Sequence, residues 1–436
     1  MTPKITPKTL SGFKDRLPKE AYAKSLMLKS LVSTFEKFGF SPIETPHLEY
    51  ATILRKQGGD EIAKEIYHFL DHGGREVALR FDLTVPLARF ISQYKNELGL
   101  PFKRYSIGNV FRGERSQKGR YREFTQCDFD FIGTQGIGSD AEIVQLIYQS
   151  LWDLGIRDFV IHLNNRKIFN GLCESLNAKN EVVEILRIID KIDKIGKEAI
   201  YQELSEKTSL QSEQIQTLLD FINLKSDTPK ILAKLQTYKT LNTTLKQGIE
   251  ELEELLDLLQ NLIPPQFYQI NLSIARGLGY YTGIIYETTL TQIPTLGSVC
   301  SGGRYDNLTQ NFSSEKMSGV GASIGLDRLL AGLEELNLLK AQKTPANLLV
   351  IPLHSLKYTY EVGMKLRDLG LRVEVYPEIT KPKKSFQYAN NKGYEWVVIV
   401  GEEEEKTQKI SLKNMESGLQ ENLIDLEVAA QKISKF

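Results

Sequence analysis

The stretch RYSIGNVFRGERSQKGRYREFTQCDFDFIG, from Arg104 to Gly133, decides the fold of the surrounding chain. It predicts two strands joined by a long loop. Side chains of the second strand alternate, with Thr125, Cys127, Phe129 and Phe131 on one face and Gln126, Asp128 and Asp130 on the other. The first face is apolar enough for a core. The second face is a row of acids and an amide, and such side chains can be buried only with hydrogen-bond or ionic partners.

The loop between these strands is more cationic than closure of a hairpin requires. Arg112 and Glu114 share one side by the period of the first strand, and the basic residues that follow are Arg115, Lys118, Arg120 and Arg122. A solvated hairpin prefers a tight Asn-Gly or Asp-Gly turn. We therefore expect a phosphate-rich partner. The alternative is an exposed hairpin whose basic tip pairs with its own acids.

The segment FRGERSQKGRYREFTQ resembles the second signature motif of class II aminoacyl-tRNA synthetases, in the form found in histidyl-tRNA synthetases. The resemblance implies that Arg112 is catalytic and binds ATP together with Glu114. It implies that tRNA is contacted by Arg115, Gln117 and Arg122. It also implies that Gln126 and Asp130 bind L-histidine, because their oxygens suit an imidazole and an ammonium group.

Composition describes an ordinary globular protein of 436 residues, with 41% hydrophobic and 25% charged side chains. The 55 basic and 55 acidic side chains balance, so nucleic-acid binding must depend on local patches. Three widely spaced cysteines, Cys127, Cys173 and Cys300, argue against disulfides and zinc ribbons. The sequence has no signal-like or membrane-length apolar stretch. We expect a cytoplasmic protein with no membrane partner.

The N-terminal part predicts a helix over 21–37 that stops at Gly39, followed by one short strand over 40–50. Pro46 within that strand indicates an edge position or a bulge. The unit resembles the first class II motif, which in that family builds the dimer interface. The resemblance therefore implies a homodimer.

A hairpin is predicted over 67–89, with its turn from Asp71 to Gly74 and its second strand ending at Pro86. Asp82 and Thr84 are two residues apart, so their side chains lie on the same face of the predicted strand. The family resemblance implies that these two residues bind the amino acid. The alternative is that Thr84 caps the next helix.

The middle of the chain predicts a helix capped by Asp140 and ending at Gly155, then a strand over 158–165 and a helix from Arg166. Gly136 and Gly138 have the wrong spacing for a dinucleotide fingerprint. Residues 169–264 are rich in Leu, Glu and Lys at helical spacing, which predicts a helical insertion, with a short coiled coil over 249–262 as the alternative. In the family such an insertion lies over the tRNA acceptor stem.

Strands resume at Phe267, and Arg276 follows one of them before a glycine-rich turn containing Gly277, Gly279 and Gly283. ARGLGYYTG resembles the histidine-specific signature of the family. The resemblance implies that Arg276 is catalytic and that Tyr280 and Tyr281 bind histidine. The family's usual Asp after R-G-L is Gly279 here.

A small-residue strand from Gly319 feeds a helix through Gly325, and Arg328 lies in the first turn of that helix. Cations are disfavoured near helix N-termini, so we expect a partner anion. The segment resembles the third class II motif, which implies that Arg328 is catalytic and binds ATP. From residue 346 onward the pattern βαβαβ predicts an α/β domain on a mainly parallel sheet, similar to the anticodon-binding domain of the family.

We therefore expect an α+β catalytic domain on a mainly antiparallel sheet, with a helical insertion and a C-terminal α/β anticodon-binding domain. The expected boundaries are 1–168 and 265–338 for the catalytic domain, 169–264 for the insertion, and 346–436 for the anticodon-binding domain. The resemblance implies a histidine–tRNA ligase using L-histidine, ATP, Mg²⁺ and tRNA(His). The alternatives are a non-catalytic regulatory subunit of histidine biosynthesis, a tRNA-sensing module, and another ATP-dependent ligase on the same fold.

Overall fold

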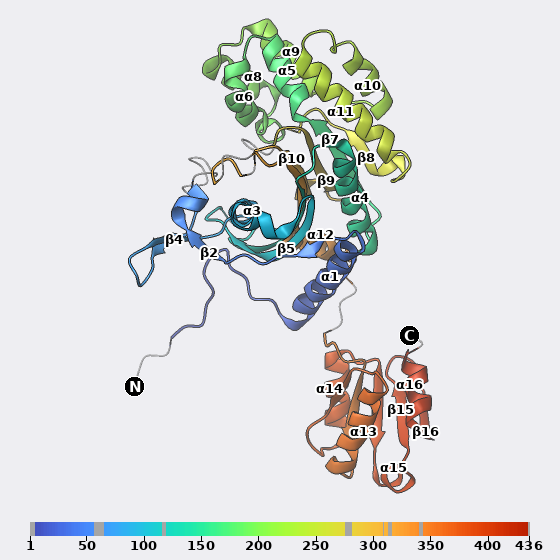
Figure 1. The fold of residues 1–436 in the computed structure, drawn as a ribbon. Coiled ribbons are helices and arrows are strands. Elements are labelled where there is room, and N and C mark those ends of the chain that lie inside the picture. The colour runs from blue at the N-terminus through green and yellow to red at the C-terminus, as the bar shows by residue number, and fades with distance from the viewer. Residues whose placement is uncertain are drawn as a thin grey trace. The chain divides into compact units, whose positions relative to one another are not determined.

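The structure is a computed structural model (Figure 1). It describes residues 5–55, 65–115, 119–274, 281–307, 309–312, 316–339 and 343–434. The chain forms two compact units, Met1–Lys14 with Met27–Leu338 and Asp15–Leu26 with Leu339–Phe436. Among the described helices, none combines the length and apolar character that crossing a bilayer demands.

The larger unit is built on an eight-stranded sheet that is mainly antiparallel, as expected. Among the described strands of this sheet, only the outermost pairs, β1 with β5 and β7 with β8, are parallel. In spatial order the strands are β1 (Ser41–Pro42), β5 (Phe102–Phe111), β6 (Glu123–Ile132), β11 (Gly319–Gly325), β10 (Ser298–Tyr305), β9 (Ile284–Leu290), β7 (Phe159–Asn165) and β8 (Tyr268–Ile270).

The hairpin predicted from Arg104 to Gly133 is confirmed as β5 and β6, which pair without interruption from Phe102 opposite Ile132 to Phe111 opposite Glu123. The apolar face of β6 packs on helix α1 (Pro18–Lys37), where the rings of Phe129 and Phe35 lie 5.0 Å apart. The face that carries the acids is also buried. Those acids therefore line an interior cavity rather than the surface.

The prediction of a single strand over 40–50 is wrong. The structure has two strands there, β1 in the large sheet and β2 (Leu48–Tyr50) in a separate three-stranded sheet with β4 (Glu76–Leu79) and β3 (His68–Leu70). Pro42 and Pro46 lack the N–H groups that a continuous ladder needs. Between them, the Thr45 carbonyl accepts a hydrogen bond from Arg80 Nη1 at 2.7 Å instead of pairing with a strand.

The hairpin of β3 and β4 confirms the turn from Asp71 to Gly74, but Pro86 does not end a strand. It lies in the first turn of α3 (Thr84–Leu98), where its missing N–H would have no helical partner. The Asp82 carboxylate, not Thr84, receives the hydrogen bond from the Val85 N–H at 3.0 Å. Asp82 therefore serves the start of this helix.

Asp140 does not cap a helix. Helix α4 (Ile137–Asp153) begins three residues earlier, with Gly136 as its N-cap residue. Asp140 is buried in an ion pair with Arg304, whose Nη2 lies 2.5 Å from Oδ2. An aspartate can serve either as a helix N-cap or as the ionic partner of a buried arginine. Asp140 takes the second role, because it pairs with the distant Arg304. The helix does end beside Gly155, which has a φ of +82°.

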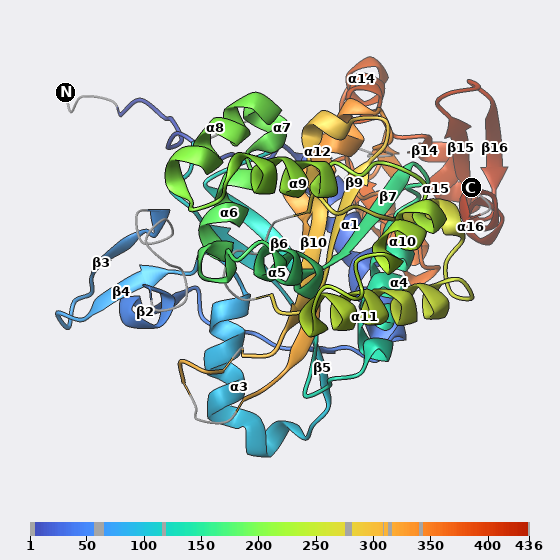
Figure 2. The ribbon, with the colours of Figure 1, turned by 90° about the horizontal axis from the view of Figure 1, so that it is seen from above.

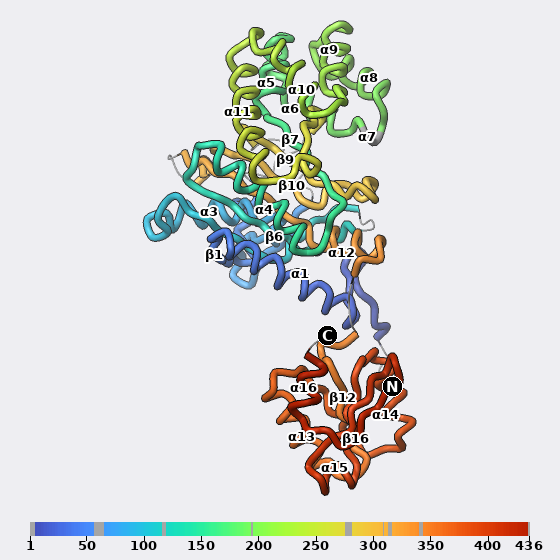
Figure 3. The backbone as a smooth tube through the Cα atoms, turned by 90° about the vertical axis from the view of Figure 1, so that its right-hand side faces the viewer, coloured from blue at the N-terminus to red at the C-terminus, as the bar shows by residue number. Residues whose placement is uncertain are grey.

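Helices dominate the region between β7 and β8, as the sequence predicted, and they gather at one end of the larger unit (Figures 1 and 3). Seen from above, these helices lie toward the viewer (Figure 2). α11 packs closely on α5, because Gly171 and Gly248 allow the two backbones to approach. The elements are α5 (Arg166–Ser175), η1 (Lys179–Glu181), α6 (Val182–Ile189), α7 (Ile192–Ile195), α8 (Lys197–Lys207), α9 (Ser212–Ile222), α10 (Thr228–Gln236), α11 (Thr243–Leu259) and η2 (Pro265–Phe267).

The rest of the larger unit confirms that a small-residue strand leads into a helix. β11 ends at Gly325 and α12 (Leu326–Glu335) follows at once. A short 3-10 helix, η3 (Pro294–Leu296), joins β9 to β10.

The smaller unit has a five-stranded sheet in the order β13 (Val373–Val375), β12 (Leu348–Pro352), β14 (Trp396–Val400), β15 (Ile410–Asn414) and β16 (Gln420–Ile424). The first three strands are parallel, as predicted, whereas β15 and β16 are antiparallel additions that the sequence analysis missed. Apolar clusters form on the described strands. The unit is completed by the helices α13 (Leu356–Asp368), α14 (Pro382–Lys392), α15 (Glu402–Thr407) and α16 (Leu426–Ser434).

Candidate functional site

A cavity of about 340 Å³ opens over β6, β11, β10 and β9, beside the start of α3 and α12. It collects most of the described residues that the sequence analysis singled out, namely Asp82, Thr84, Arg112, Glu114, Gln126, Asp130, Tyr281 and Arg328. Arg115 and Arg122 do not line it. The predictions for Arg276, Tyr280 and Gln117 fall on residues outside the described part of the chain.

Small residues on β11 make room for the acids of β6. In the register of the two strands, Gly325, Ser323 and Gly321 lie opposite Gln126, Asp128 and Asp130. A Cβ atom on Gly321 would lie 2.0 Å from Oδ1 of Asp130. The glycine therefore preserves both the acid and the space above it.

Asp130 is held by two partners that the sequence analysis did not name. Its Oδ2 lies 2.5 Å from Nη2 of Arg104, and its Oδ1 accepts a hydrogen bond from the Tyr305 hydroxyl at 2.5 Å. Burial raises the pKa of Asp130, while the Arg104 charge opposes that rise. Arg104 and Arg112 are an even number of residues apart, so strand alternation places them on the same side of β5. The sequence therefore already indicated that Arg104 faces the site.

Asp128 is the acid on this wall that the sequence analysis left without a role. It is 3% exposed, and its Oδ1 has no hydrogen-bond partner among the described residues. Burial raises its pKa to about 7, with Asp130 and Asp82 adding to the rise and Arg104 opposing it. Alternation along β6 already placed Asp128 between Gln126 and Asp130.

Gln126 adds a second unsatisfied acceptor to the same wall. Its Nε2 donates a hydrogen bond to Oγ of Ser323 at 2.9 Å, whereas its Oε1 has no partner in the described structure. A buried polar atom without a partner is unfavourable, so these oxygens are ready to accept from a ligand.

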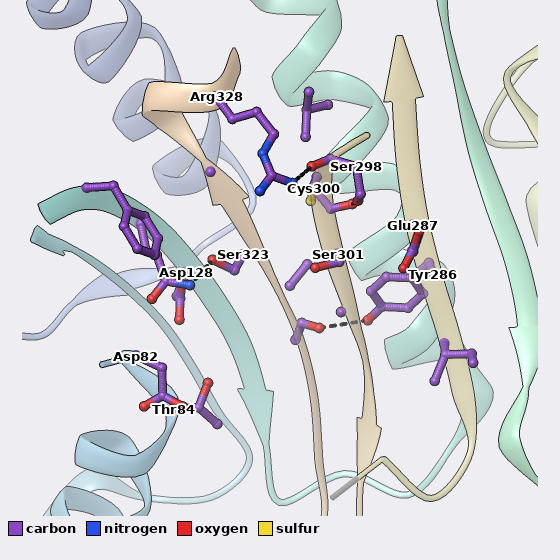
Figure 4. A pocket seen from close by; sticks show the side chains of 18 of the residues that line it. Asp82, Thr84, Asp128, Tyr286, Glu287, Ser298, Cys300, Ser301, Ser323 and Arg328 are labelled. Carbon is purple, nitrogen blue, oxygen red and sulfur yellow. Dashed lines mark hydrogen bonds between the residues drawn. The ribbon is translucent and has the colours of Figure 1, made fainter. Parts of the chain in front are cut away.

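Asp82 and Thr84 lie at the end of the cavity opposite Arg328 (Figure 4). Burial raises the pKa of Asp82 to about 6, while the Val85 N–H and the Arg112 charge oppose the rise. This end of the cavity therefore presents carboxylates that a cationic ligand would stabilise in their ionised form.

Backbone carbonyls hold two arginines of the cavity, Arg112 beside Asp82 and Arg328 at the opposite end. Arg112 Nε donates to the Phe81 carbonyl at 2.9 Å, and its guanidinium lies over the Phe124 ring at 5.2 Å. Arg328 Nη1 donates to the Ser298 carbonyl at 2.6 Å. Arg120, which we did not assign to this site, also lines the cavity and lies 3.8 Å from Glu114.

Two loop arginines have different environments. Arg115 is exposed. Arg122 donates from Nε to the Glu114 carbonyl and from Nη1 to the Ser11 carbonyl, both at 3.2 Å. Arg122 therefore braces the loop against the N-terminal segment.

The lining suits positioning and charge stabilisation rather than nucleophilic catalysis. Its described residues include no histidine, and burial raises the pKa of the Cys300 thiol well above its usual value, which keeps the thiol protonated. A cavity lined by carboxylates together with the guanidinium groups of Arg112 and Arg328 can bind an amino group and a phosphate together. Among the described residues, no three or more His, Cys, Asp or Glu side chains are grouped to hold a metal ion.

Comparison with known proteins decides the family. Residues 12–329 match the family model described as "Histidyl-tRNA synthetase", and residues 347–436 match "Anticodon binding domain". The chain belongs to the histidyl-tRNA synthetase family. Members of this family are class II aminoacyl-tRNA synthetases, so the resemblance drawn from the central motif is confirmed.

Similar members of the histidyl-tRNA synthetase family match over nearly their whole length. The histidine–tRNA ligase of Wolinella succinogenes is 59% identical over 432 residues, covering 98% of both chains. That of Helicobacter hepaticus is 57% identical, covering 95% of this chain and 96% of the relative. The crystal structure of histidyl-tRNA synthetase from Nostoc sp. PCC 7120 has a TM-score of 0.90 at 37% identity, covering 99% of this chain and all of the other.

Proposed function

We propose that this chain ligates L-histidine to the 3′ end of tRNA(His), with ATP, through a histidyl-adenylate. The observation that carries the proposal is the cavity that joins Asp82, Gln126 and Asp130 to Arg112 and Arg328. Identity of 53–59% to histidine–tRNA ligases over nearly the whole chain disfavours the regulatory subunit.

The proposed first step is attack of the histidine carboxylate on the α-phosphate of ATP. A bond forms between a carboxylate oxygen and phosphorus, and pyrophosphate leaves with the electrons of the broken P–O bond. Arg112 and Arg328 stabilise the negative charge that develops on the phosphoryl oxygens. Arg276 is assigned to the same step by its sequence motif.

In the second step the terminal hydroxyl of tRNA attacks the activated carbonyl, and AMP leaves. Asp82 and Thr84 hold the histidine ammonium group, while Gln126, Asp130 and Tyr281 hold its imidazole. We assign Tyr280 to the histidine site by its motif. ATP is bound by Arg112, Glu114 and Arg328.

Mg²⁺ is expected with ATP. The ion needs only one or two protein carboxylates when phosphates supply other oxygens. Glu114 and Glu287 are glutamates of the cavity wall, and we propose that they would hold the ion there, where it would neutralise phosphate charge.

We propose that tRNA(His) is contacted by Arg115, Gln117 and Arg122 at its acceptor end. The helical insertion over 169–264 would cover the acceptor stem, and the domain over 346–436 would bind the anticodon. The remaining segments, 1–168 and 265–338, form the catalytic domain in this proposal. The cysteines at 127, 173 and 300 are buried and form no disulfide, which supports a reducing cytoplasm.

We propose that the chain works as a homodimer. The three-stranded sheet exposes Leu48, Tyr50, Phe69 and Leu70, each at least 40% exposed. Large apolar side chains that gather on one small sheet favour a partner surface, and a second copy is the occupant we propose. Sedimentation of the wild type and of Phe69→Glu tests this, and a monomeric wild type contradicts it.

Pyrophosphate exchange with each standard amino acid, followed by aminoacylation of tRNA(His), tests the function. We expect exchange with histidine alone, because a site built to hydrogen-bond a polar side chain rejects analogues lacking it. Equal exchange with another amino acid contradicts the specificity. A folded protein that binds tRNA without exchange instead supports the sensing module.

A further inference from the structure

Arg104 is an arginine with 0% exposure on β5, the second strand of the large sheet, directly opposite Asp130 on the neighbouring strand β6. Its Nη2 lies 2.5 Å from Asp130 Oδ2, so the two form an ion pair by distance. None of its three guanidinium nitrogens, however, has an aligned hydrogen-bond partner among the described residues. Burying an arginine without hydrogen bonds costs free energy, and nearby carboxylates can offset that cost.

Another buried arginine of the same sheet provides the contrast. Arg304 donates to Asp140, to the carbonyls of Thr134 and Gly136, and to the Ser139 hydroxyl. Such saturation is expected of an arginine that holds elements of the fold together. Arg104 instead retains unused donors beside two acids.

The acids beside Arg104 explain why a charge is needed there. Asp128 and Asp130 are two residues apart on one face of β6, 3% and 4% exposed, and two like charges so close cannot both ionise without a cation. Oδ1 of Asp128 has no partner in the described part of the chain. The wall therefore holds two carboxylates, both influenced by one arginine that contacts Asp130, with water largely excluded.

We propose that Arg104 is a positioning residue for amino-acid recognition, which favours the ionised forms of Asp128 and Asp130 and holds Asp130 against Tyr305. The inference rests on the proposed function, because the ligand that benefits from two fixed anionic groups is an ammonium or an imidazole. Asp128 then offers its free oxygen to that ligand, as an additional acceptor on the specificity wall.

The charges around the pair support this role. Asp128 is faced by Arg104 and Asp130, by Asp82 near α3, by Arg80 after β4, and by Ser323 and Cys300 on β11 and β10. Tyr305 on β10 and Tyr286 on β9 face Asp130. Burial raises the pKa of both acids, and Arg104 is the strongest opposing influence on each. Without Arg104 the pKa of each acid would rise further, so both would hold their protons more tightly at neutral pH.

A double-mutant cycle tests the proposal on the full-length enzyme, with KM for histidine and KM for ATP measured by pyrophosphate exchange. The variants are Arg104→Met, Asp128→Asn and the double variant. We expect Arg104→Met to raise the histidine KM by at least ~10-fold while the ATP KM changes less than about twofold. Adding Asp128→Asn removes the second acid and should recover part of the loss, so the two effects are not additive.

The pH dependence of the histidine KM gives a second readout. In Arg104→Met the loss should shrink as pH rises, because the acids ionise again, and Arg104→Lys should restore most of the affinity by returning the charge. Arg304→Met is the matched control, a buried arginine outside the cavity, which should lower the melting temperature with the histidine KM unchanged. If Arg104→Met fails to fold, Arg104→Lys and its pH profile replace it.

Two results would overturn the proposal: a histidine KM within about twofold of wild type in Arg104→Met, or additive effects in the cycle. Either result would make Arg104 purely structural. If the proposed function itself is wrong, the wild type will show no pyrophosphate exchange with histidine. That result distinguishes failure of the function from failure of the Arg104 proposal.

Discussion

The Asp327 carboxylate accepts a hydrogen bond from the backbone N–H of Thr125, with 2.6 Å between Oδ2 and the nitrogen. Both residues are buried. The contact joins the first turn of α12 to β6 across 202 residues of sequence. Arg328 follows Asp327 and Gln126 follows Thr125, so one hydrogen bond sets the spacing between the phosphate end and the amino-acid end of the cavity.

Replacing Asp327 should therefore disturb ATP binding without direct contact with ATP. Asp327→Ala leaves the Thr125 N–H buried and unsatisfied, which should lower the free energy of unfolding by ~1–3 kcal/mol. The KM for ATP should rise because α12 shifts. Asp327→Asn keeps an acceptor and is the control. Melting temperature and exchange kinetics measure both effects, and an unchanged melting temperature in Asp327→Ala contradicts the argument.

Asp82 should make stability depend on pH. Its pKa is raised by burial from 3.8 to about 6, so the folded state binds the proton more tightly than the unfolded chain does. The free energy of unfolding should then fall as pH rises between about 4 and 6, and level off above, by on the order of 1–3 kcal/mol for an acid partly open to a cavity.

Asp82→Asn isolates this effect, since asparagine still accepts from the Val85 N–H but does not titrate. The difference in melting temperature between the two proteins, measured from pH 4.5 to 7.5, should favour the variant increasingly as pH rises. Its histidine KM should rise at every pH. A difference curve that is flat across this range would show that Asp82 ionises normally.

Local periodicity was enough to predict the framework of the site. The alternation in β6 placed Gln126 and Asp130 on one face, and the run of small residues before Gly325 indicated the strand that leads into α12. These patterns depend on neighbours a few residues apart, which a sequence displays directly.

The errors arose where a distant partner competes with a local preference. Asp140 looks like a helix cap, yet Arg304, 164 residues later, buries it in an ion pair. Tyr305 lies 175 residues from Asp130, and no local pattern links them. β15 and β16 were missed because much of β16 is polar and exposed, which obscures the alternation of a strand.

Gly171 should control the packing of the helical insertion. A Cβ atom there would lie 2.6 Å from the backbone nitrogen of Leu245, so Gly171→Ala must push α11 away from α5. We expect a loss of ~1–3 kcal/mol in stability from this overpacking. Aminoacylation should fall more than histidine exchange, because the insertion is proposed to serve tRNA. Gly196→Ser, at an open position with a φ of +84°, offers a comparison in which strain is local.

If Gly171→Ala reduces exchange and aminoacylation equally at a temperature where the protein is folded, the insertion supports the catalytic cavity rather than tRNA. Circular dichroism at the assay temperature establishes that the protein is folded.

Arg115 and Arg122 should respond differently to replacement by alanine, although both were assigned to tRNA. Arg115 is exposed and lies outside the cavity, so Arg115→Ala should slow transfer to tRNA and leave exchange intact. Arg122 holds the carbonyls of Glu114 and Ser11, so Arg122→Ala should loosen the loop that carries Glu114 and slow both half-reactions.

Salt separates a phosphate contact from a structural brace. If Arg115 neutralises one phosphate, Arg115→Ala should reduce the slope of log affinity for tRNA against log salt concentration by about one. Arg122→Lys should not rescue the variant at position 122, because an ammonium cannot reproduce the two directed donors of the guanidinium. Single-turnover transfer and pyrophosphate exchange, measured on the same preparations, provide the test. Loss of both half-reactions in Arg115→Ala would move that residue into the ATP site.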